Sequence, residues 1–579
     1  MTSIGYQAFL SCKNIANVFY MGDIADWCNI SFRGTPTGGS EIHSNLYIQG
    51  QLITDLTIPN GITSIGKYTF NGFDSLINLT IPESVTSIGN SAFENCTSLT
   101  SVTISGSVAS IGAYAFSSCN NLTNVTIENG VTSIGEGVFK NCSNLKSAII
   151  PDSVTSIGRS VFDSCSSLES LTLPFVGECK ENNKYPFGYL FGWGSLWNGV
   201  GNETYQHTLV PDSYGNYYQY HQQTYYIPGS IESVTITGDK IPDYAFEQCD
   251  FSTIIFTDKL VSIGKYAFES CWLLTDVVIP KSVTSIGSAA FNNCHKLKDT
   301  YYEGTLEEWC NISFKGGGAN PLHSGGNLYI NNQLVTSVTI PDCITAIGYC
   351  FTGCTSLTEI ILHNEISSIA GSAFEGCQNL TSIAIPNSVT SIGSRAFRDC
   401  HKLTGQIIIP NSVTSMGSSV FNLDNLLIYC EAKCQPEEWS SNWNNSDSPV
   451  VWDCNNNDVG EDGYIYTIID GLLYGIKEGV STVVRQSDYS IEIFTIPSAI
   501  TYKGTQYSVT SIGSYAFYNY SCYPKKIIIP DSVTYIGVEA FDPSHSNLTL
   551  YFESIFLPEG WDYDSVHHFK VVYGYKGEN

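Results

Sequence analysis

Apolar residues recur along the chain in a unit of 23 residues. Between Leu99 and Cys119 the unit reads Leu-x-x-Val-x-Ile-x-x-Ser-Val-x-x-Ile-Gly-x-x-Ala-Phe-x-x-Cys, and its alternate residues Val102 and Ile104 predict a short strand that points them inward. The Ser-Ile-Gly step ends, with the same spacing, at Gly66, Gly89, Gly112, Gly135 and Gly158. Because one coil cannot bury its own apolar face, the pattern predicts a repeat solenoid in which each coil packs on its neighbours.

Each remaining part of the unit has an expected structural role. Val108 and Ile111 bury the segment that returns after the strand, and Gly112 is expected to supply a backbone shape that a Cβ would forbid. Ala115 and Phe116 open a short turn, a 3-10 helix or a one-turn helix, and we expect the repeat phenylalanines to stack from coil to coil. The predicted fold class is a solenoid with a parallel β-sheet whose strands lie ~4.8 Å apart.

Interruptions of the period divide the chain. Residues 3–32 match residues 285–314 at an offset of 282, and both copies carry the insertion Tyr-x-Gly-x-x-x-x-Trp-Cys-Asn-Ile-Ser-Phe. In the second copy we expect residues 305–310 to form a short helix with Trp309 packed on the end of the coil; an exposed Trp309 that binds a ligand is the alternative. The predicted organisation begins with a repeat array over 1–173, with an insertion at 20–50, and an aromatic-rich insertion at 174–230. A second repeat array follows over 231–429, with an insertion at 302–332. The chain then has a Trp/Cys cap at 430–454, a linker at 455–463 and a short second repeat module over 464–579.

Composition narrows the classes of partner. The chain has 54 acidic and 26 basic residues among its 579, for a formal net charge of −28, which argues against binding to nucleic acid or to anionic lipid. Only 14% of the residues are charged, so the polar surface must be built from Ser, Thr, Asn, Gly and the 36 tyrosines. No apolar run approaches the ~18–20 residues that a membrane span requires, so we expect no membrane-spanning segment.

Cysteine placement follows the repeat, because eleven of the 20 cysteines lie three residues after a repeat phenylalanine. Neighbouring coils would bring them close enough for disulfides, but we favour a ladder of free, buried thiols that pack as small hydrophobes. A spacing of 23 residues matches no CxxC metal pattern. The ladder consists of Cys12, Cys96, Cys119, Cys142, Cys165, Cys249, Cys271, Cys294, Cys354, Cys377 and Cys400. In the cap, Cys430, Cys434 and Cys454 are open to one disulfide or to free thiols.

Motifs with catalytic or metal chemistry are incomplete in this sequence. Residues 61–68 nearly spell a phosphate loop, but Tyr68 stands where Ser or Thr should hold Mg²⁺. A calcium-like start at Asp453 has Asp458 in place of the required Gly, and no Glu closes it. No GxSxG elbow and no Cys/His nucleophile pair stands out. We therefore expect no catalytic residue, no metal site and no cofactor, and predict a non-enzymatic protein.

The full unit, with its Ser-Ile-Gly step and its Ala-Phe-x-x-Cys end, resembles the BspA-like class of leucine-rich repeat proteins over nearly the whole chain, residues 464–541 included. The resemblance implies a leucine-rich-repeat solenoid without a shared catalytic motif. It also implies a cell-surface or secreted protein of bacteria or some protists in mucosal habitats, which binds host matrix proteins, host cells or other microbes. The chain opens inside a repeat unit and shows no signal peptide, so we expect an incomplete N-terminus.

Two functions of different classes remain, and an enzyme is a distant third. The first is an adhesin-like binding module, monomeric, that presents its solenoid surface to host proteins or glycans. The second is a passive structural spacer or coat. Candidate contact residues lie at outward strand positions and in the aromatic insertion: Ser101, Thr103, Ser170, Thr172, Tyr189, Phe191, Trp193, Trp197, Tyr217, Tyr218 and Tyr220. Tyr and Trp offer large contact areas with few rotatable bonds, although the same rings can instead fold into a small subdomain packed on the coil edge.

Overall fold

The computed structural model describes most of the chain. The described residues are 1–5, 8, 15–34, 44–180, 185–192, 202–211, 218–423, 426–445, 448–452, 463–486, 491–517, 524–541, 547–554, 566 and 569–575. They form two compact units, Met1–Leu334 and Val335–Asn579. The division falls directly after the insertion predicted at 302–332, and nearly all of the predicted linker at 455–463 lies outside the described residues.

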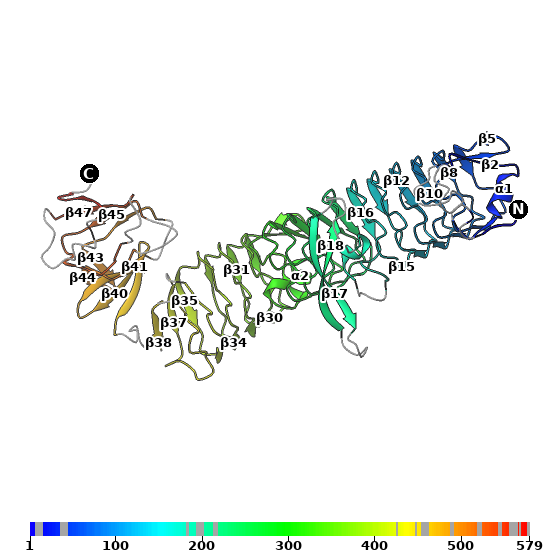
Figure 1. Ribbon diagram of the computed structural model, residues 1–579. Coiled ribbons are helices and arrows are strands. Elements are labelled where there is room, and N and C mark those ends of the chain that lie inside the picture. Colours follow the sequence, from blue (N-terminus) through cyan, green and yellow to red (C-terminus); the bar gives the residue numbers. More distant parts are fainter. Residues whose placement is uncertain are drawn as a thin grey trace. The chain divides into compact units, whose positions relative to one another are not determined.

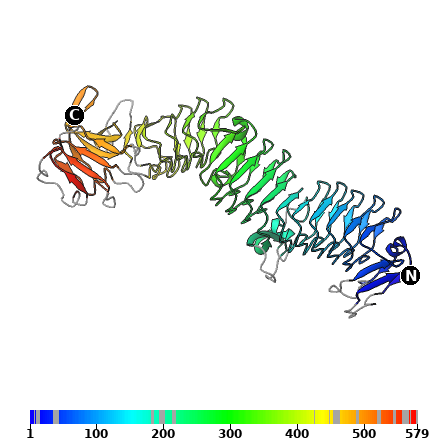
Figure 2. The ribbon, with the colours of Figure 1, turned by 90° about the horizontal axis from the view of Figure 1, so that it is seen from above.

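Coils of the first unit each add one strand to a parallel sheet, and Figures 1 and 2 show these strands side by side. Eight strands pair in chain order: β6 Asp55–Thr57, β8 Asn78–Thr80, β10 Ser101–Ile104, β12 Asn124–Ile127, β14 Ser147–Ile149, β16 Ser170–Leu173, β19 Ser233–Ile236 and β21 Thr253–Phe256. The register follows the period, because Val102 pairs with Val125. Beside β21 packs a second sheet of β23 Asp276–Ile279, β25 Asp299–Tyr302, β27 Asn327–Ile330 and the antiparallel β28 Gln333–Leu334.

The Ser-Ile residues of the repeat form another row of two-residue strands. One parallel sheet contains β7 Ser64–Ile65, β9 Ser87–Ile88, β11 Ser110–Ile111, β13 Ser133–Ile134 and β15 Ser156–Ile157. Another contains β20 Lys240–Ile241, β22 Ser262–Ile263, β24 Ser285–Ile286 and β26 Ser313–Phe314. The first residues contribute β1 Ser3–Ile4 beside β3 Ser31–Phe32, and β2 Asn17–Tyr20 beside β4 Asn45–Ile48 and β5 Gln51–Leu52. These rows confirm the predicted parallel solenoid.

Inward residues of each coil form the core. In β10, Val102 and Ile104 are at most 3% exposed, whereas the residues between them face outward. The repeat phenylalanines stack as predicted: the ring centroid of Phe116 lies 5.2 Å from that of Phe93 and 6.0 Å from that of Phe139, with the planes nearly parallel. Since every ring is buried between two coils, most of the stabilising apolar burial arises between neighbours.

The repeat glycine at position 112 is required by the close approach of the preceding coil, which corrects the expectation for Gly112. Its φ angle lies outside the left-handed region, but a Cβ at this position would lie 2.5 Å from the backbone nitrogen of Asn90 and 2.6 Å from the carbonyl carbon of Gly89. Positive φ angles occur instead at Tyr114 (58°) and Ser118 (59°), in the turn that follows. The glycine therefore makes room for the preceding coil, and residues with side chains adopt the left-handed conformation.

Residues 174–230 leave the solenoid and return without changing its register. Strand β16 pairs directly with β19, so that Ser170 lies opposite Ser233. Within the excursion, the short 3-10 helix η1 (Phe187–Leu190) precedes an antiparallel hairpin of β17 (Asn202–Pro211) and β18 (Tyr218–Ile227). In Figure 1 this hairpin crosses the row of coils and extends past it. The array thus accommodates the insertion as a side excursion.

The duplicated insertions each contain a short helix, as predicted for residues 305–310. In the second copy, α2 (Leu306–Asn311) begins at Thr305, whose hydroxyl accepts a hydrogen bond from the Glu308 backbone nitrogen at 3.2 Å. Trp309 is fully buried and packs against two rings of the insertion at centroid distances of 5.3 Å, so it is not the exposed ligand-binding Trp of the alternative. The first copy repeats this arrangement with α1 (Ile24–Cys28), and the second copy continues into η2 (Gly317–Ala319).

The second unit begins as the same kind of solenoid. Its sheets contain β29 Ser337–Thr339, β31 Glu359–Ile361 and β33 Ser382–Ile383; β30 Ala346–Ile347, β32 Ser368–Ile369, β34 Ser391–Ile392 and β36 Ser415–Met416; and β35 Gly405–Ile409, β37 Leu426–Cys430 and β38 Val450–Trp452. At the end of its phenylalanine stack, Phe421 meets Trp443 at 6.2 Å. Trp443 packs on Trp439 and Trp452, so the Trp-rich segment covers the last ring.

The remaining part of the second unit contains antiparallel strands that the repeat pattern did not predict. An antiparallel meander consists of β39 Ile465–Ile469, β40 Leu472–Lys477 and β41 Val480–Gln486. The same sheet contains β43 Ala499–Tyr502, β44 Thr505–Ile512 and β46 Tyr535–Ile536. A separate parallel sheet contains β42 Ile493–Thr495, β45 Lys526–Ile529, β47 Thr549–Phe552 and β48 Lys570–Val572. The meander turns at Asp-Gly (470–471, φ 48° and 76°) and Glu-Gly (478–479, φ 54° and 84°), because tight hairpins favour two positive φ angles. The two expected repeat units are present, and Phe517 stacks on Phe541 at 5.6 Å.

Candidate binding surface

The outward side chains of the first unit's strands form a continuous surface, which we call the outer face. It has two parallel rows, since each strand of three or four residues points alternate residues outward. The first row is Asp55, Asn78, Ser101, Asn124, Ser147, Ser170, Ser233, Thr253, Asp276, Asp299 and Asn327. The second row is Thr57, Thr80, Thr103, Thr126, Ile149, Thr172, Thr235, Ile255, Val278, Tyr301 and Tyr329.

The four strand residues predicted from the sequence all lie on the outer face. Ser101 and Thr103 are exposed on β10, and Ser170 and Thr172 are half-buried on β16. Among the described residues, none of these four hydroxyls forms a side-chain hydrogen bond within the chain. They are neutral donors and acceptors that remain available to an incoming partner.

Along the second row, the chemistry changes from hydroxyl to apolar. From β6 to β12 the outward residue is threonine, whereas β21, β23, β25 and β27 carry Ile255, Val278, Tyr301 and Tyr329. The rings of Tyr301 and Tyr329 stack at 4.6 Å with an interplanar angle of 20°. The sequence reasoning missed this part of the face, although the duplicated Asn-Leu-Tyr-Ile segment held the signal: its alternation buries Leu328 and turns Tyr329 outward.

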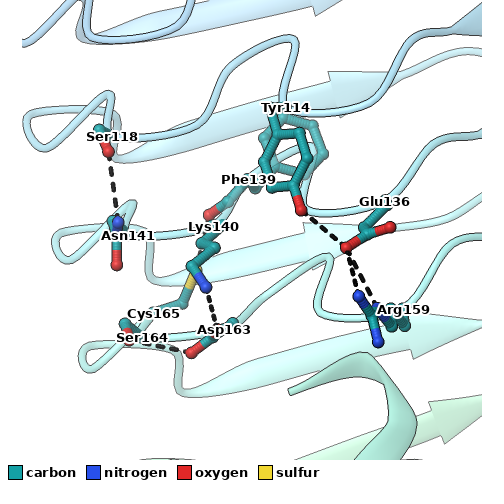
Figure 3. Close-up of polar contacts among 10 residues, drawn as sticks. All are labelled: Tyr114, Ser118, Glu136, Phe139, Lys140, Asn141, Arg159, Asp163, Ser164 and Cys165. Atoms are coloured by element: carbon teal, nitrogen blue, oxygen red, sulfur yellow. Dashed lines mark hydrogen bonds and ion pairs between the residues drawn. The ribbon is translucent and has the colours of Figure 1, made fainter. Parts of the chain in front are cut away.

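The turn edge of the solenoid contrasts with the outer face, because its polar groups satisfy one another (Figure 3). The Tyr114 hydroxyl donates to Glu136 Oε1 at 2.7 Å, and Arg159 Nε donates to the same oxygen at 3.1 Å. These hydrogen bonds lower the pKa of Glu136, and burial followed by the Glu136 carboxylate raises the pKa of Tyr114 to about 12. Lys140 pairs with Asp163 at 2.7 Å. Each of these three contacts joins neighbouring coils, so this edge stabilises the stack.

The cysteine ladder forms part of the interior. The following ladder cysteines are buried free thiols: Cys96, Cys119, Cys142, Cys165, Cys249, Cys271, Cys294, Cys377 and Cys400. Most donate to the carbonyl oxygen of the phenylalanine one coil back, as Cys96 does to Phe70 at 3.2 Å. Burial raises the pKa of Cys96 and of Cys142 to about 12, which suppresses the nucleophilic thiolate. Cys12 and Cys454 lie outside the described residues, and Cys434 is an exposed free thiol.

In the aromatic insertion, η1 continues the core. Phe187 lies 5.1 Å from Phe246, and Phe191 lies 6.5 Å from Phe162, so these rings bridge the stack between the coils that flank the insertion. Phe191 is only 2% exposed, which corrects its assignment as a contact residue: its ring fills the gap that the excursion would otherwise leave. Tyr189 is half-buried and stacks on Tyr185 at 4.6 Å.

Buried polar groups hold the hairpin against the solenoid. Gln206 on β17 is fully buried; its side-chain oxygen accepts from the Gly188 nitrogen at 2.8 Å, and its amide donates to the Glu247 carbonyl at 2.9 Å. His207 Nδ1 lies 2.7 Å from the Glu247 carboxylate, and burial raises the pKa of Glu247. The predicted contact residues Tyr218 and Tyr220 belong to β18. Trp193, Trp197 and Tyr217 lie outside the described residues.

The described part of the chain has neither a cluster of metal ligands nor a membrane-spanning helix. There, no three His, Cys, Asp or Glu side chains converge on a common point where a metal ion would be held. Asp453 and Asp458, from the incomplete calcium motif, lie outside the described residues. No helix among the described residues has the length and hydrophobicity to cross a bilayer.

A family model matches most of the chain. The model of the BspA type leucine-rich repeat region fits in six copies, over residues 40–169, 221–320, 325–434 and 488–560. These ranges comprise more than half of the sequence, and the family model points to no enzyme. No curated protein matches the chain.

Several solved structures are similar to this chain. A leucine-rich repeat protein from Bacteroides ovatus is 24% identical, covering 62% of this chain and 87% of its own, with a TM-score of 0.32. A leucine-rich cell surface protein from Faecalibacterium prausnitzii is 23% identical, covering 70% and 82%, with a TM-score of 0.26. The pneumococcal vaccine antigen PcpA is 17% identical, covering 74% and 91%, with a TM-score of 0.26. At these identities and TM-scores, nothing about the function of this chain follows from the likeness.

Proposed function

We propose that this chain, which belongs to the family of BspA-type leucine-rich repeat proteins, is a non-enzymatic, adhesin-like binding protein of the cell surface or the extracellular space. It presents its solenoid surface to host proteins, glycans or other cells. The observation that carries the proposal is the difference between two surfaces of the first unit. Polar groups of the turn edge pair with one another, whereas the hydroxyls of Ser101, Thr103, Ser170 and Thr172 on the outer face form no side-chain hydrogen bond within the described residues.

Contact over many strands suits this surface. Each strand adds one or two small polar side chains, and adjacent strands repeat them ~4.8 Å apart, so a partner would form many weak contacts along the row. Ser101, Thr103, Ser170 and Thr172 are the proposed hydroxyl contacts. A catalytic site would instead need a convergent set of acids, bases or nucleophiles, and the buried cysteines have raised pKa values that oppose such a role.

The aromatic insertion is the second proposed contact region. Tyr189, Trp193, Trp197, Tyr217, Tyr218 and Tyr220 are its proposed contact residues. Support comes from the projecting hairpin, which adds a surface of different composition to the regular face (Figure 1). Aromatic side chains there would provide the concentrated contact area that binding hot spots use.

A passive spacer or coat is the alternative function. Its coils would need the stacked core and the paired turn edge, but nothing about a spacer requires a projecting aromatic hairpin or exposed apolar groups on the outer face. Ile255 is 47% exposed and Ile149 is 60% exposed on that face. Exposed apolar groups of this kind favour a surface that meets another molecule.

The test is a binding screen of the folded protein against immobilised matrix proteins and a glycan array. A variant that carries Ser101→Arg and Thr103→Arg should lose the bound partner. The matched control carries Asn121→Arg and Asn144→Arg, which add the same charge at exposed turn positions. Equal binding by both variants would place the contact elsewhere, and no binding to any component of the screen would favour the spacer.

The insertion is tested separately with Trp193→Ala, Trp197→Ala and Tyr218→Ala. A contact role requires weaker attachment with an unchanged melting temperature. If the melting temperature falls along with attachment, the rings support the fold, and the hydroxyl rows of the outer face remain as the proposed contact region.

A further inference from the structure

The apolar end of the outer face, in the last coils of the first unit, has its own composition. Four outward residues lie directly opposite one another on the adjacent strands β23, β25, β27 and β28: Val278, Tyr301, Tyr329 and Leu334. Val278 is 39% exposed and Leu334 is 46% exposed, while both tyrosines are half-buried. We call these four residues the apolar row. They form a continuous apolar stripe one side chain wide, unlike the threonines earlier on the same face.

Carboxylates lie beside the apolar row. Asp276 and Asp299 occupy the outward positions two residues before Val278 and Tyr301, and their negative charge contributes to raising the pKa of Tyr301, after burial. Asp299 accepts a hydrogen bond from the Asn327 side chain at 2.9 Å. In the described part of the chain, no lysine or arginine forms an ion pair with either carboxylate. The surface thus has an apolar row and a parallel acidic row.

The same chain shows that two neighbouring tyrosine rings can hold a cation. In the second unit, the Lys526 ammonium lies 4.4 Å from the ring centroid of Tyr551 and 4.6 Å from that of Tyr575. Its nitrogen also donates to the Tyr575 hydroxyl at 3.0 Å. Tyrosine rings attract cations through their negative faces, and nearby carboxylates strengthen that attraction. The pair Tyr301 and Tyr329 has the carboxylates and has no such lysine among its ring contacts in the described residues.

The spacing of the row favours one shape of partner. Adjacent strands lie ~4.8 Å apart, and an α-helix advances ~5.4 Å per turn, so a helix laid along the row can place one apolar side chain against each strand. Basic residues on the flank of that helix would then face Asp276 and Asp299.

We propose that the apolar row and its two carboxylates bind a basic amphipathic helix of a partner protein. The inference rests on the proposed binding function and specifies the partner class for one part of the outer face. The duplication provides an internal comparison: Phe19, Tyr47 and Leu52 repeat the aromatic pair and the leucine, with rings stacked at 4.6 Å. There Asn17 replaces Asp299, so we expect weaker binding at this first copy.

The probe is a synthetic amphipathic Lys/Leu helix, titrated calorimetrically into the full chain at low and at high salt. A Glu/Leu peptide of the same length and a linear glucose oligosaccharide serve as the competing ligands. Micromolar binding of the Lys/Leu peptide that weakens with salt is expected, with no binding of the other two. Binding of the oligosaccharide, or equal binding of both peptides, would overturn the proposal.

Variants locate the binding site. Tyr301→Ser with Tyr329→Ser should weaken peptide binding by about tenfold or more, as should Asp276→Asn with Asp299→Asn. The control for the first pair is Ile149→Ser, an exposed apolar residue on the same face with threonine neighbours. The control for the second is Glu83→Gln with Glu365→Gln, which removes the same net charge from two exposed positions.

The two pairs of variants decide between a local site and general charge attraction. If the glutamate controls weaken binding as much as the aspartate variants do, the peptide responds to net charge alone and the proposal fails. Circular dichroism melts show that each variant is folded before it is titrated. The matrix-protein screen is run on the same proteins, so a wild-type chain that binds a matrix component but does not bind the Lys/Leu peptide refutes this inference and leaves the proposed function standing.

Discussion

Two glycines at the same position of the repeat should respond oppositely to replacement by alanine. Gly112 follows Ser-Ile and Gly348 follows Ala-Ile, and neither glycine has a positive φ angle. A Cβ on Gly112 would lie 2.5 Å from the Asn90 backbone nitrogen, whereas a Cβ on Gly348 would meet nothing within 4 Å. Neither glycine is needed for a left-handed conformation, and the two positions differ in what a Cβ would meet.

The magnitude for Gly112→Ala follows from the displacement that it requires. Ordinary contact begins near 3.4 Å, so the two coils must separate by roughly 1 Å. That movement stretches the hydrogen bonds from the Gly112 nitrogen to Ile88 (2.7 Å) and from the Ala113 nitrogen to the Asn90 side chain (3.1 Å). Overpacking costs about 1–3 kcal/mol and each weakened hydrogen bond about 1 kcal/mol, so we expect a loss of about 3 kcal/mol. Gly348→Ala should instead stabilise the chain by about 0.5 kcal/mol, because it restricts only the unfolded state.

Hydrogen exchange measured by mass spectrometry is the suitable assay, since repeat proteins open locally and a single global melt can hide the effect. Gly112→Ala should accelerate exchange in the coils around residues 85–140, and Gly348→Ala should leave exchange around residues 340–380 unchanged or slower. Equal destabilisation at both positions would mean that the glycine is needed for its conformation. No change at either would mean that neighbouring coils can spread apart freely.

Three further predictions concern the interior and the turn edge. Phe116→Ala or Phe139→Ala should cost about 3–5 kcal/mol in urea melts, since each removes a ring stacked between two others; unchanged melts would contradict the stack. A thiol reagent at pH 8 should label exposed Cys434 in the folded protein and the ladder thiols only after denaturation, because burial raises their pKa values; rapid labelling of Cys96 would contradict this. The pKa of Glu136 is lowered in the folded chain, so the ionised carboxylate stabilises the fold above the ordinary pKa of 4.5, and this stabilisation is lost as the pH falls. Glu136→Gln should therefore lower the melting temperature at pH 7. The difference in melting temperature from wild type should shrink towards pH 3.

The solenoid could be predicted from the sequence because one spacing recurs with little change. Inward positions such as Val102 and Phe116 accept few residue types, so their period is visible without an alignment. The role of Gly112 could not be derived in the same way. A glycine that adopts positive φ and a glycine that lies against a neighbouring backbone look the same in sequence, and only the coordinates distinguish them.

The antiparallel hairpins escaped prediction for a different reason. Their turns at 470–471 and 478–479 are Asp-Gly and Glu-Gly, the first of which is a strong hairpin signal by itself. In a chain with 51 glycines, many of them within the repeat, this signal is easily attributed to the array. The apolar row could not be recognised from one strand alone, because the alternation that buries Leu328 does not reveal that Tyr329 stacks on Tyr301 of the neighbouring strand.

The two copies of the duplicated segment show how this architecture separates stability from recognition. Between them, the buried Trp27 and Trp309 are the same residue in the same short helix, and the buried Leu46 and Leu328 are the same residue at the same inward strand position. The outward positions differ: Asn17 corresponds to Asp299, and Phe19 corresponds to Tyr301. Because an outward side chain touches only its row neighbours, its replacement leaves the Phe stack and the coil-to-coil hydrogen bonds intact. A solenoid can therefore acquire a new charge or ring at one strand without repacking its core, which is why we expect partner specificity to reside in the outward rows and their insertions.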